Sequence, residues 1–168
     1  MRVATPLGRL PWWAVILGNA AFWPVWTVVA GFVTQRAAAS RFANDDAITR
    51  LRAFEGDGHW YRDRLDIHAW KDRLPEAGAA FGGFAKRSVR AGDIEHLETF
   101  VVETRRAEHA HWRMVSGVLV TCAWNPWWAM PVNMTVALGS NLPCIAVQRY
   151  NRARLRRLLN RSRLTYAR

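Results

Sequence analysis

Acidic residues are missing from both ends of this chain, and cysteine is scarce. All 13 Asp and Glu lie between Asp45 and Glu108. The two cysteines, Cys122 and Cys144, fall within one apolar run and form no Cys-x-x-Cys pair, which argues against a disulfide framework or a cysteine zinc site. A Gly-x-Ser-x-Gly elbow and a glycine-rich phosphate loop are also absent from the sequence, so it offers no serine-hydrolase or nucleotide-binding signature.

Charge is missing from two long runs. Residues 11–33 and 114–148 contain no Asp, Glu, Lys or Arg, and about 20 apolar residues are enough to cross the hydrocarbon core of a bilayer. The first run is longer than the roughly 7 to 15 apolar residues of a signal peptide. We therefore expect an all-α integral membrane protein that crosses the cell membrane several times, with residues 11–33 forming a retained transmembrane helix.

The second run is too long for one straight crossing. As a helix it would reach roughly 52 Å, against about 30 Å of hydrocarbon. Asn125-Pro126 is a turn signal flanked by tryptophans, and such aromatic residues favour the headgroup level. We expect one membrane domain with a transmembrane hairpin over 106–148, its tip at Asn125-Pro126. A polar membrane-proximal segment over 34–105 precedes it, with an interfacial helix over 35–54 and a second helix from Asp93.

The tail over 149–168 holds eight arginines and no acid. A basic segment directly after an apolar one is typical of a cytoplasmic element facing anionic lipid, where each arginine gains about 1 kcal/mol. This favours the bilayer over nucleic acid as the partner, and it predicts that the polar motifs face the cytoplasm. The planar guanidinium also suits phosphate or carboxylate, so a binding site and a simple positive stop sequence both stay open.

Glu108 and His111 are three residues apart, so on a helix they share a face. A carboxylate in that position would orient the imidazole as a general base; the alternative is an amphipathic helix with solvated charges. Glu-x-x-His is half of a di-iron pattern, but the second half is absent from the sequence, so we expect no metal. The hairpin would bring this motif beside the arginines that begin at Arg149.

His68 and Asp72 form a second candidate pair. Their spacing is that of the His-x-x-x-Asp element of some acyltransferases, in which the histidine is the base. The same spacing recurs at His59 and Asp63, so a pair of residues in a surface or interfacial loop is an equally simple interpretation.

Three blocks of sequence resemble one enzyme family. WKDRLP at 70–75, VETRRAEHAHW at 102–112 and NLPCIAVQRYNRARL at 141–155 are similar, in order and spacing, to the glycosyl-4,4'-diaponeurosporenoate acyltransferases of the staphyloxanthin pathway. The similarity runs from about Trp60 to Leu159. It implies a membrane transferase of carotenoid biosynthesis that moves groups other than amino-acyl groups and needs no cofactor. It would esterify a fatty acyl chain from an acyl thioester onto the sugar of a glycosyl carotenoid acid or a similar membrane glycolipid.

The family pattern also implies site residues. We expect His111, oriented by Glu108, to deprotonate a sugar hydroxyl, with Lys71 contributing to the chemistry. The resemblance does not support His68. Two other classes stay open: a non-catalytic membrane subunit or chaperone of a carotenoid or glycolipid assembly, and a small integral membrane methyltransferase. The other matching motif positions, expected to bind substrate apart from Thr104, are Trp70, Glu103, Thr104, Arg106, Trp112, Gln148, Arg149, Tyr150, Asn151, Arg152 and Arg154.

Overall fold

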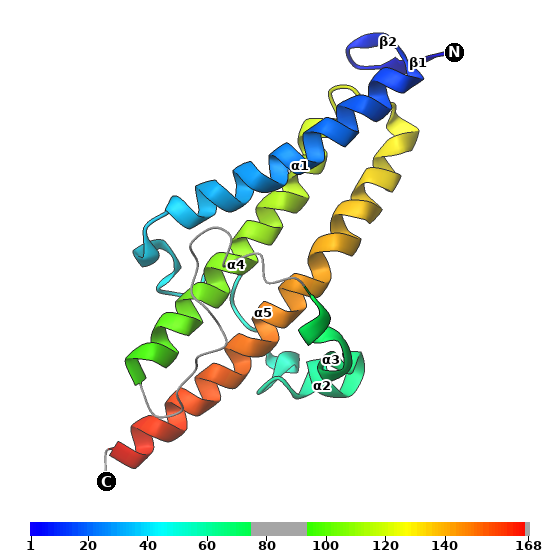
Figure 1. Cartoon of the computed structure of the whole chain (residues 1–168). Helices are drawn as coiled ribbons and strands as arrows, with labels where there is room; N and C mark the ends of the chain where they lie inside the picture. The colour runs from blue at the N-terminus through cyan, green and yellow to red at the C-terminus, as the bar shows by residue number, and fades with distance from the viewer. Residues whose placement is uncertain (75–93, 167–168) are drawn as a thin grey trace.

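The computed structural model describes residues 1–74 and 94–166 and is mostly helical (Figure 1). Three long helices run side by side: α1 (Trp12–Arg36), α4 (Ile94–Thr121) and α5 (Met130–Tyr166). The short helices α2 (His59–Leu65) and α3 (Ile67–Trp70) pack beside α5. The remaining described elements are the strands β1 (Arg2–Thr5) and β2 (Gly8–Pro11) and the 3₁₀ turns η1 (Ala39–Phe42), η2 (Ala53–Glu55), η3 (Lys71–Arg73) and η6 (Trp127–Ala129).

The N-terminal hairpin departs from the all-α expectation. Strands β1 and β2 pair antiparallel, with Thr5 opposite Gly8. Gly8 has a φ of 106°, which glycine adopts without steric cost, and its carbonyl accepts a hydrogen bond from the Thr5 hydroxyl at 2.9 Å. Four-residue strands are too short to give a recognisable alternating pattern, so tight-turn chemistry decides this element rather than periodicity.

The expected turn at Asn125-Pro126 is present between two helices. Helix α4 ends at Thr121, and the Asn125 backbone N–H donates to the Thr121 carbonyl at 3.1 Å. Helix α5 starts at Met130 and continues without a break to Tyr166, so the second limb and most of the basic tail are one helix. The expected helix from Asp93 is found from Ile94, the first described residue after the gap.

A buried amide cluster joins the three long helices next to this turn. Asn19 and Asn125 exchange hydrogen bonds of 2.8 and 3.0 Å between their side chains. Asn133 donates to Asn125 at 3.3 Å, and the indole of Trp124 donates to Asn19 at 3.3 Å. Because each amide satisfies another, α1, the turn and α5 are held together without an unpaired polar group at this point.

Closer to the C-terminal end of α1, around Trp26, α1 packs closely on α4. The Trp26 indole N–H donates to the carbonyls of Arg113 and Met114, and the ring lies directly over Gly117. A Cβ at Gly117 would lie 2.5 Å from the Trp26 ring. The absence of a side chain there is what allows the two helices to approach.

The expected interfacial helix over 35–54 is wrong. That stretch contains η1 and then turns, with no α-helix after Arg36. The Asp46 carboxylate accepts hydrogen bonds from the backbone N–H groups of Ile48 and Thr49 at 2.9 and 2.8 Å. Such local side-chain bonds offer the backbone an alternative to helix. The sequence also carries turn signals at Gly56, Asp57-Gly58, Pro75 and Gly82-Gly83. Gly56 and Gly58 have positive φ angles of 51° and 89°, as turns of this kind require; Pro75 and Gly82-Gly83 lie outside the described residues.

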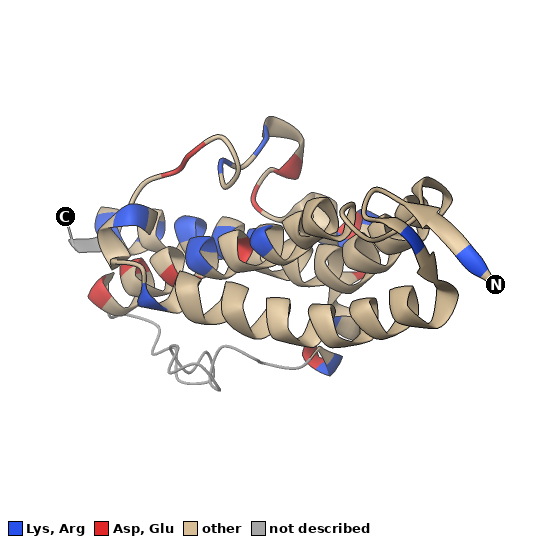
Figure 2. Ribbon diagram, turned by 90° about the horizontal axis from the view of Figure 1, so that it is seen from above, with Lys and Arg blue, Asp and Glu red and all other residues tan. Residues whose placement is uncertain are grey.

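Within the described part of the chain, two helical segments are long and apolar enough to cross a membrane, Trp12–Arg36 and Trp127–Leu164. Large apolar side chains on both are exposed, including Ile16, Phe32 and Val136. Figure 2 shows many basic and acidic residues toward the end of the bundle that holds the C-terminus, and basic residues at the N-terminal end as well. The end with the C-terminus is therefore the more highly charged of the two.

Candidate functional site

Glu108 lies completely buried between α4 and α5. Its two oxygens are used by two arginines of α5: Oε1 accepts from Arg149 Nη1 at 2.7 Å, and Oε2 accepts from Arg152 Nη2 at 2.5 Å. The expected meeting of the two polar motifs is thus confirmed. Both Glu108 oxygens bind arginines, and the hydrogen bond of His111 described below is to Asn141.

Arg149 is the centre of this network. Its Nε and Nη2 each bind a different oxygen of Glu55 at 2.7 Å, the planar two-point geometry that guanidinium and carboxylate favour. Its remaining N–H groups reach Glu108 and the carbonyls of Ile48 and Arg50. All five donors of Arg149 therefore have partners, and they tie α4, α5 and the 48–55 segment together.

Glu55 is buried, and it is held from three directions. Besides Arg149 it accepts from the backbone N–H of Arg52 and from the Tyr61 hydroxyl. Burial acts to raise the pKa of Glu55, but the hydrogen bonds from Arg149, Arg52 and Tyr61 outweigh it and the pKa lies below its usual value. Burial and the hydrogen bond to Glu55 raise the pKa of Tyr61, so this hydroxyl stays protonated and is no base.

His111 contacts a residue that the sequence did not single out. Its Nδ1 lies 2.9 Å from Oδ1 of Asn141. The Asn141 amide nitrogen donates to the Ala137 carbonyl at 2.9 Å, which fixes the amide with its oxygen toward the ring. The oxygen can only accept, so Nδ1 carries the proton and Nε2 is the basic nitrogen.

A cavity of about 570 Å³ lies between α5 and the short helical layer, and neither His111 nor Asn141 is among its lining residues. Helix α5 forms one wall, the short helices α2 and α3 form another, and Trp112 of α4 closes the space between them. Trp112 follows His111 in α4, and Leu142, another lining residue, follows Asn141 in α5. The lining residues are Ile48, Arg52, Trp60, Tyr61, Leu65, Trp70, Trp112, Leu142, Pro143, Ile145, Ala146 and Arg149.

The expected substrate-binding residues divide into two groups. Trp70, Trp112 and Arg149 line the cavity, whereas the others lie outside its lining. Glu103 and Arg106 form an ion pair of 2.6 Å on α4. Thr104, Gln148 and Tyr150 are buried, Asn151 is half-buried, and the exposed Arg154 lies over the Tyr150 ring.

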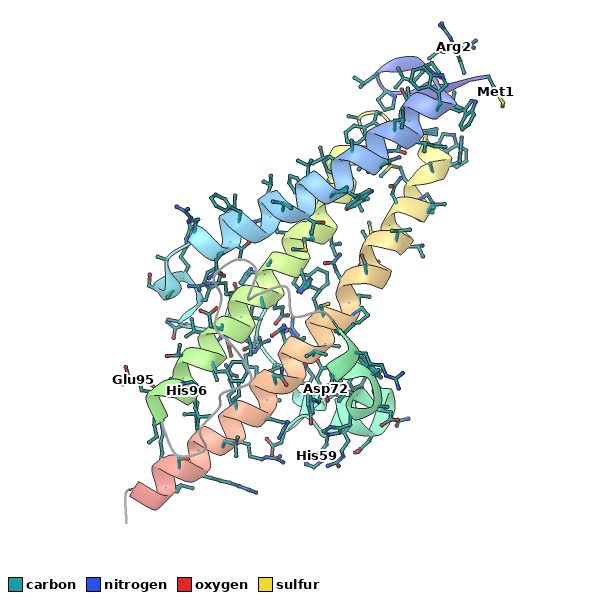
Figure 3. The ribbon with its side chains drawn as sticks, viewed as in Figure 1. Met1, Arg2, His59, Asp72, Glu95 and His96 are labelled. Carbon is teal, nitrogen blue, oxygen red and sulfur yellow. The ribbon has the colours of Figure 1, made fainter. Side chains whose placement is uncertain are left out.

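Lys71 and the second candidate pair lie in the short helical layer beside α5, where Figure 3 labels His59 and Asp72. Lys71 Nζ is 2.5 Å from Asp72. His68 Nε2 instead lies 2.9 Å from the Tyr150 hydroxyl. His68 and Asp72 thus each have a different partner, which gives no geometric support to their reading as a His-x-x-x-Asp pair.

The sequence reading missed Arg52, Glu55, Tyr61 and Asn141. Glu55 carried a usable signal, because it is one of few acids in a very basic chain and needs a partner when buried. Asn141 stood at the edge of a motif block, in an apolar run where a polar side chain is costly.

Comparison with known proteins adds to this geometry. The model of the family described as glycosyl-4,4'-diaponeurosporenoate acyltransferase matches residues 44–161. A protein of that name from Staphylococcus haemolyticus is 26% identical over 147 residues, 86% of this chain and 85% of that protein. One from Staphylococcus aureus strain MRSA252 is 30% identical over 107 residues, 63% of this chain and 64% of that protein. No solved structure matches the chain. The resemblance expected from the three motif blocks is confirmed.

Proposed function

We propose, from the premise that the chain belongs to the glycosyl-4,4'-diaponeurosporenoate acyltransferase family, that it esterifies a fatty acyl group onto a sugar hydroxyl of a glycosylated carotenoid acid or a similar membrane glycolipid. The chain is an acyltransferase that moves groups other than amino-acyl groups. The cavity carries the proposal, because it is a largely apolar space of the size that small-molecule sites have, and its lining includes Trp112 and Leu142, the sequence neighbours of His111 and Asn141.

The proposed location is the cell membrane, with several crossings and the charged end of the bundle on the cytoplasmic side. The two long apolar helices and their exposed side chains support this location. Trp12 and Trp13 at the start of α1 and Trp127 and Trp128 just before α5 are exposed, as expected of aromatics at a membrane interface. The arginines of the C-terminal helix favour the side with anionic lipid.

In the proposed reaction His111 Nε2 takes the proton of the sugar hydroxyl. The sugar oxygen then attacks the carbonyl carbon of an acyl thioester; the new C–O bond forms, the C–S bond breaks, and the proton passes from His111 to the departing sulfur. A positioned base of this kind contributes about 10²- to 10⁴-fold in rate. Asn141 acts as a positioning residue, since it keeps the proton on Nδ1 and leaves Nε2 free of it.

The other expected roles change with the geometry. Glu108 and Arg149 hold the helices to the 48–55 segment, because their polar atoms are bonded to one another and to neighbouring groups. For contact with a phosphate-bearing carrier we propose the exposed arginines Arg52 and Arg154 instead. Lys71 is half-buried and bound to Asp72, and we assign it to that contact.

The test is mass spectrometry of lipid extracts from cells that make the glycosylated carotenoid acid. They express the wild-type chain, His111→Ala, or His109→Gln as a matched control on the same helix; His109 pairs with Asp46 away from the cavity. We expect a product heavier by one acyl group with wild type and with His109→Gln, and at least about 100-fold less with His111→Ala. Full product from His111→Ala would remove the base assignment, and no product from any form would contradict the proposed acceptor.

A further inference from the structure

We propose that the cavity holds the fatty acyl chain of the donor thioester, with Arg52 at its polar edge facing the phosphates of the carrier. The inference rests on the proposed acyl transfer and adds which substrate occupies the site. Among the described lining residues, Arg52 and Arg149 bear the charges, and the rest are aliphatic or aromatic. A long chain with an anionic head matches this division.

Of the two arginines, Arg52 is the one able to receive a ligand. Arg149 already uses all its N–H groups on Glu55, Glu108 and two carbonyls. Arg52 is exposed, and its side chain makes one long bond, 3.3 Å, to the Ala47 carbonyl. A guanidinium in this position binds two phosphate oxygens at once.

The lining does not suit a sugar. Hydroxyl groups lose affinity in a site that offers them few partners. Trp112 Nε1 is unpaired, but two other polar atoms of the lining are already bonded. Trp70 Nε1 donates to the Leu65 carbonyl at 2.8 Å, and the Tyr61 hydroxyl donates to Glu55. Methylene groups need only apolar contact, which Leu142, Ile145 and the tryptophan rings supply.

The position of the cavity agrees with an acyl chain whose carbonyl must meet the base. Trp112 and Leu142 line it, and their sequence neighbours His111 and Asn141 form the 2.9 Å pair. His111 and Asn141 are not themselves in the lining, so the reactive end of a chain lying along α5 would leave the cavity past Trp112 and Leu142 to meet this pair. The sugar acceptor would approach from outside the cavity.

The first experiment measures binding without turnover. The full-length protein in phosphatidylcholine nanodiscs is exposed to palmitoyl coenzyme A with a photoreactive group near the chain end, and cross-linked peptides are mapped by mass spectrometry. We expect labels within residues 60–70 and 142–149. Ala146→Leu adds bulk to the cavity wall and should lower this labelling about tenfold. Gly139→Leu is the control, because a Cβ there meets nothing within 4 Å, and should leave it unchanged.

The second experiment tests whether Arg52 binds the phosphates of the acyl carrier. Arg52→Gln should weaken binding of palmitoyl coenzyme A about tenfold, whereas Arg41→Gln, at an exposed arginine outside the cavity, should not. A photoreactive phosphatidylglycerol serves as the rival source of an acyl chain with an anionic head. Cavity labelling by that lipid and not by the thioester would overturn the donor assignment.

Equal labelling of all variants, spread over the exposed faces of α1 and α5, would mean ordinary partition into surrounding lipid and would also overturn the inference. The labelling experiments contain no sugar acceptor, so they test donor binding independently of the acyl transfer that the lipid analysis measures. Variant-dependent labelling without any acylated product would retain the cavity site and reject the reaction. Acylated product with no cavity labelling would retain the reaction and reject the cavity as the site of the acyl chain.

Discussion

Arg149 and Glu108 are joined by a 2.7 Å hydrogen bond between Nη1 and Oε1, across the interface of α4 and α5. The same guanidinium forms an ion pair with Glu55, which lies more than 90 residues earlier in the chain. Two buried carboxylates thus share one cation, and Arg152 supplies the second positive charge. The charges balance within a largely buried interface, where an unpaired charge would be very costly.

Arg149→Lys should destabilise the fold by about 3–5 kcal/mol, because an ammonium group cannot replace the planar contacts and leaves Glu55 and Glu108 partly unpaired. Arg154→Lys, at an exposed arginine over the Tyr150 ring, should cost less than about 1 kcal/mol. Thermal denaturation of the detergent-solubilised proteins measures both. Equal melting temperatures for the two variants would show that the network contributes little stability.

Asn141→Leu should lower kcat about 10- to 100-fold and leave KM within about twofold, because it removes the acceptor that keeps the proton on His111 Nδ1. Asn141→Asp keeps an acceptor oxygen at that place and should recover most of the loss. Steady-state kinetics with an acyl thioester distinguishes the cases. A purely structural role for Asn141 predicts equal damage from both substitutions.

Stability should fall in acid through Glu55 and Asp46. Hydrogen bonds outweigh burial and lower the pKa of both: that of Glu55 below its usual 4.5, that of Asp46 from 3.8 to about 2. Their stabilising contribution is therefore complete above about pH 4.5 and is lost as the pH falls through the lowered values. The loss is up to about 1.4 kcal/mol per pH unit for the buried Glu55 and smaller for the exposed Asp46, because solvent screens its charge. Denaturant unfolding at pH 7, 5, 4 and 3 measures this.

Glu55→Gln should flatten that acid dependence, whereas Glu98→Gln, at a surface ion pair with Arg163, should not. An unchanged slope in Glu55→Gln would assign the acid sensitivity to other carboxyl groups.

Gly117→Ala and Gly139→Ala make the same chemical change on two long helices and should have opposite effects. At Gly117 the new Cβ collides with the Trp26 ring at 2.5 Å, and such overpacking costs about 1–3 kcal/mol. At Gly139 the Cβ meets nothing within 4 Å, so alanine should stabilise the helix by up to about 1 kcal/mol. Melting temperatures compared under one condition check the pair, and a loss at both positions would contradict the packing argument.

The long helices and the turn at Asn125-Pro126 were predictable from sequence because they follow from charge-free runs and from one strong turn signal. The N-terminal strands were not, since a hairpin this short depends on Gly8 and its neighbours rather than on a pattern. The segment over 35–54 misled because its apolar spacing resembles a helix, while the Asp46 side chain caps a turn instead.

The site was predictable only in part, for a related reason. The expected hairpin placed the motif of Glu108 and His111 beside Arg149, and the structure packs their two helices side by side. Which carboxylate serves which cation depends on burial and on distant partners such as Glu55, and spacing along one helix carries no information on those. The same holds for Asn141, whose relation to His111 appears only once α4 and α5 are packed.

The amide cluster at the turn can form only late in translation. Asn19 finds its partner in Asn125, 106 residues later, so during synthesis α1 is complete long before the group that satisfies it exists. Until Asn125 has been synthesised, the side-chain amide of Asn19 in α1 lacks this hydrogen-bond partner. This link between α1 and the turn therefore forms only after Asn125 has been made, whereas the contacts of Trp26 with Arg113, Met114 and Gly117 can hold α1 against α4 earlier.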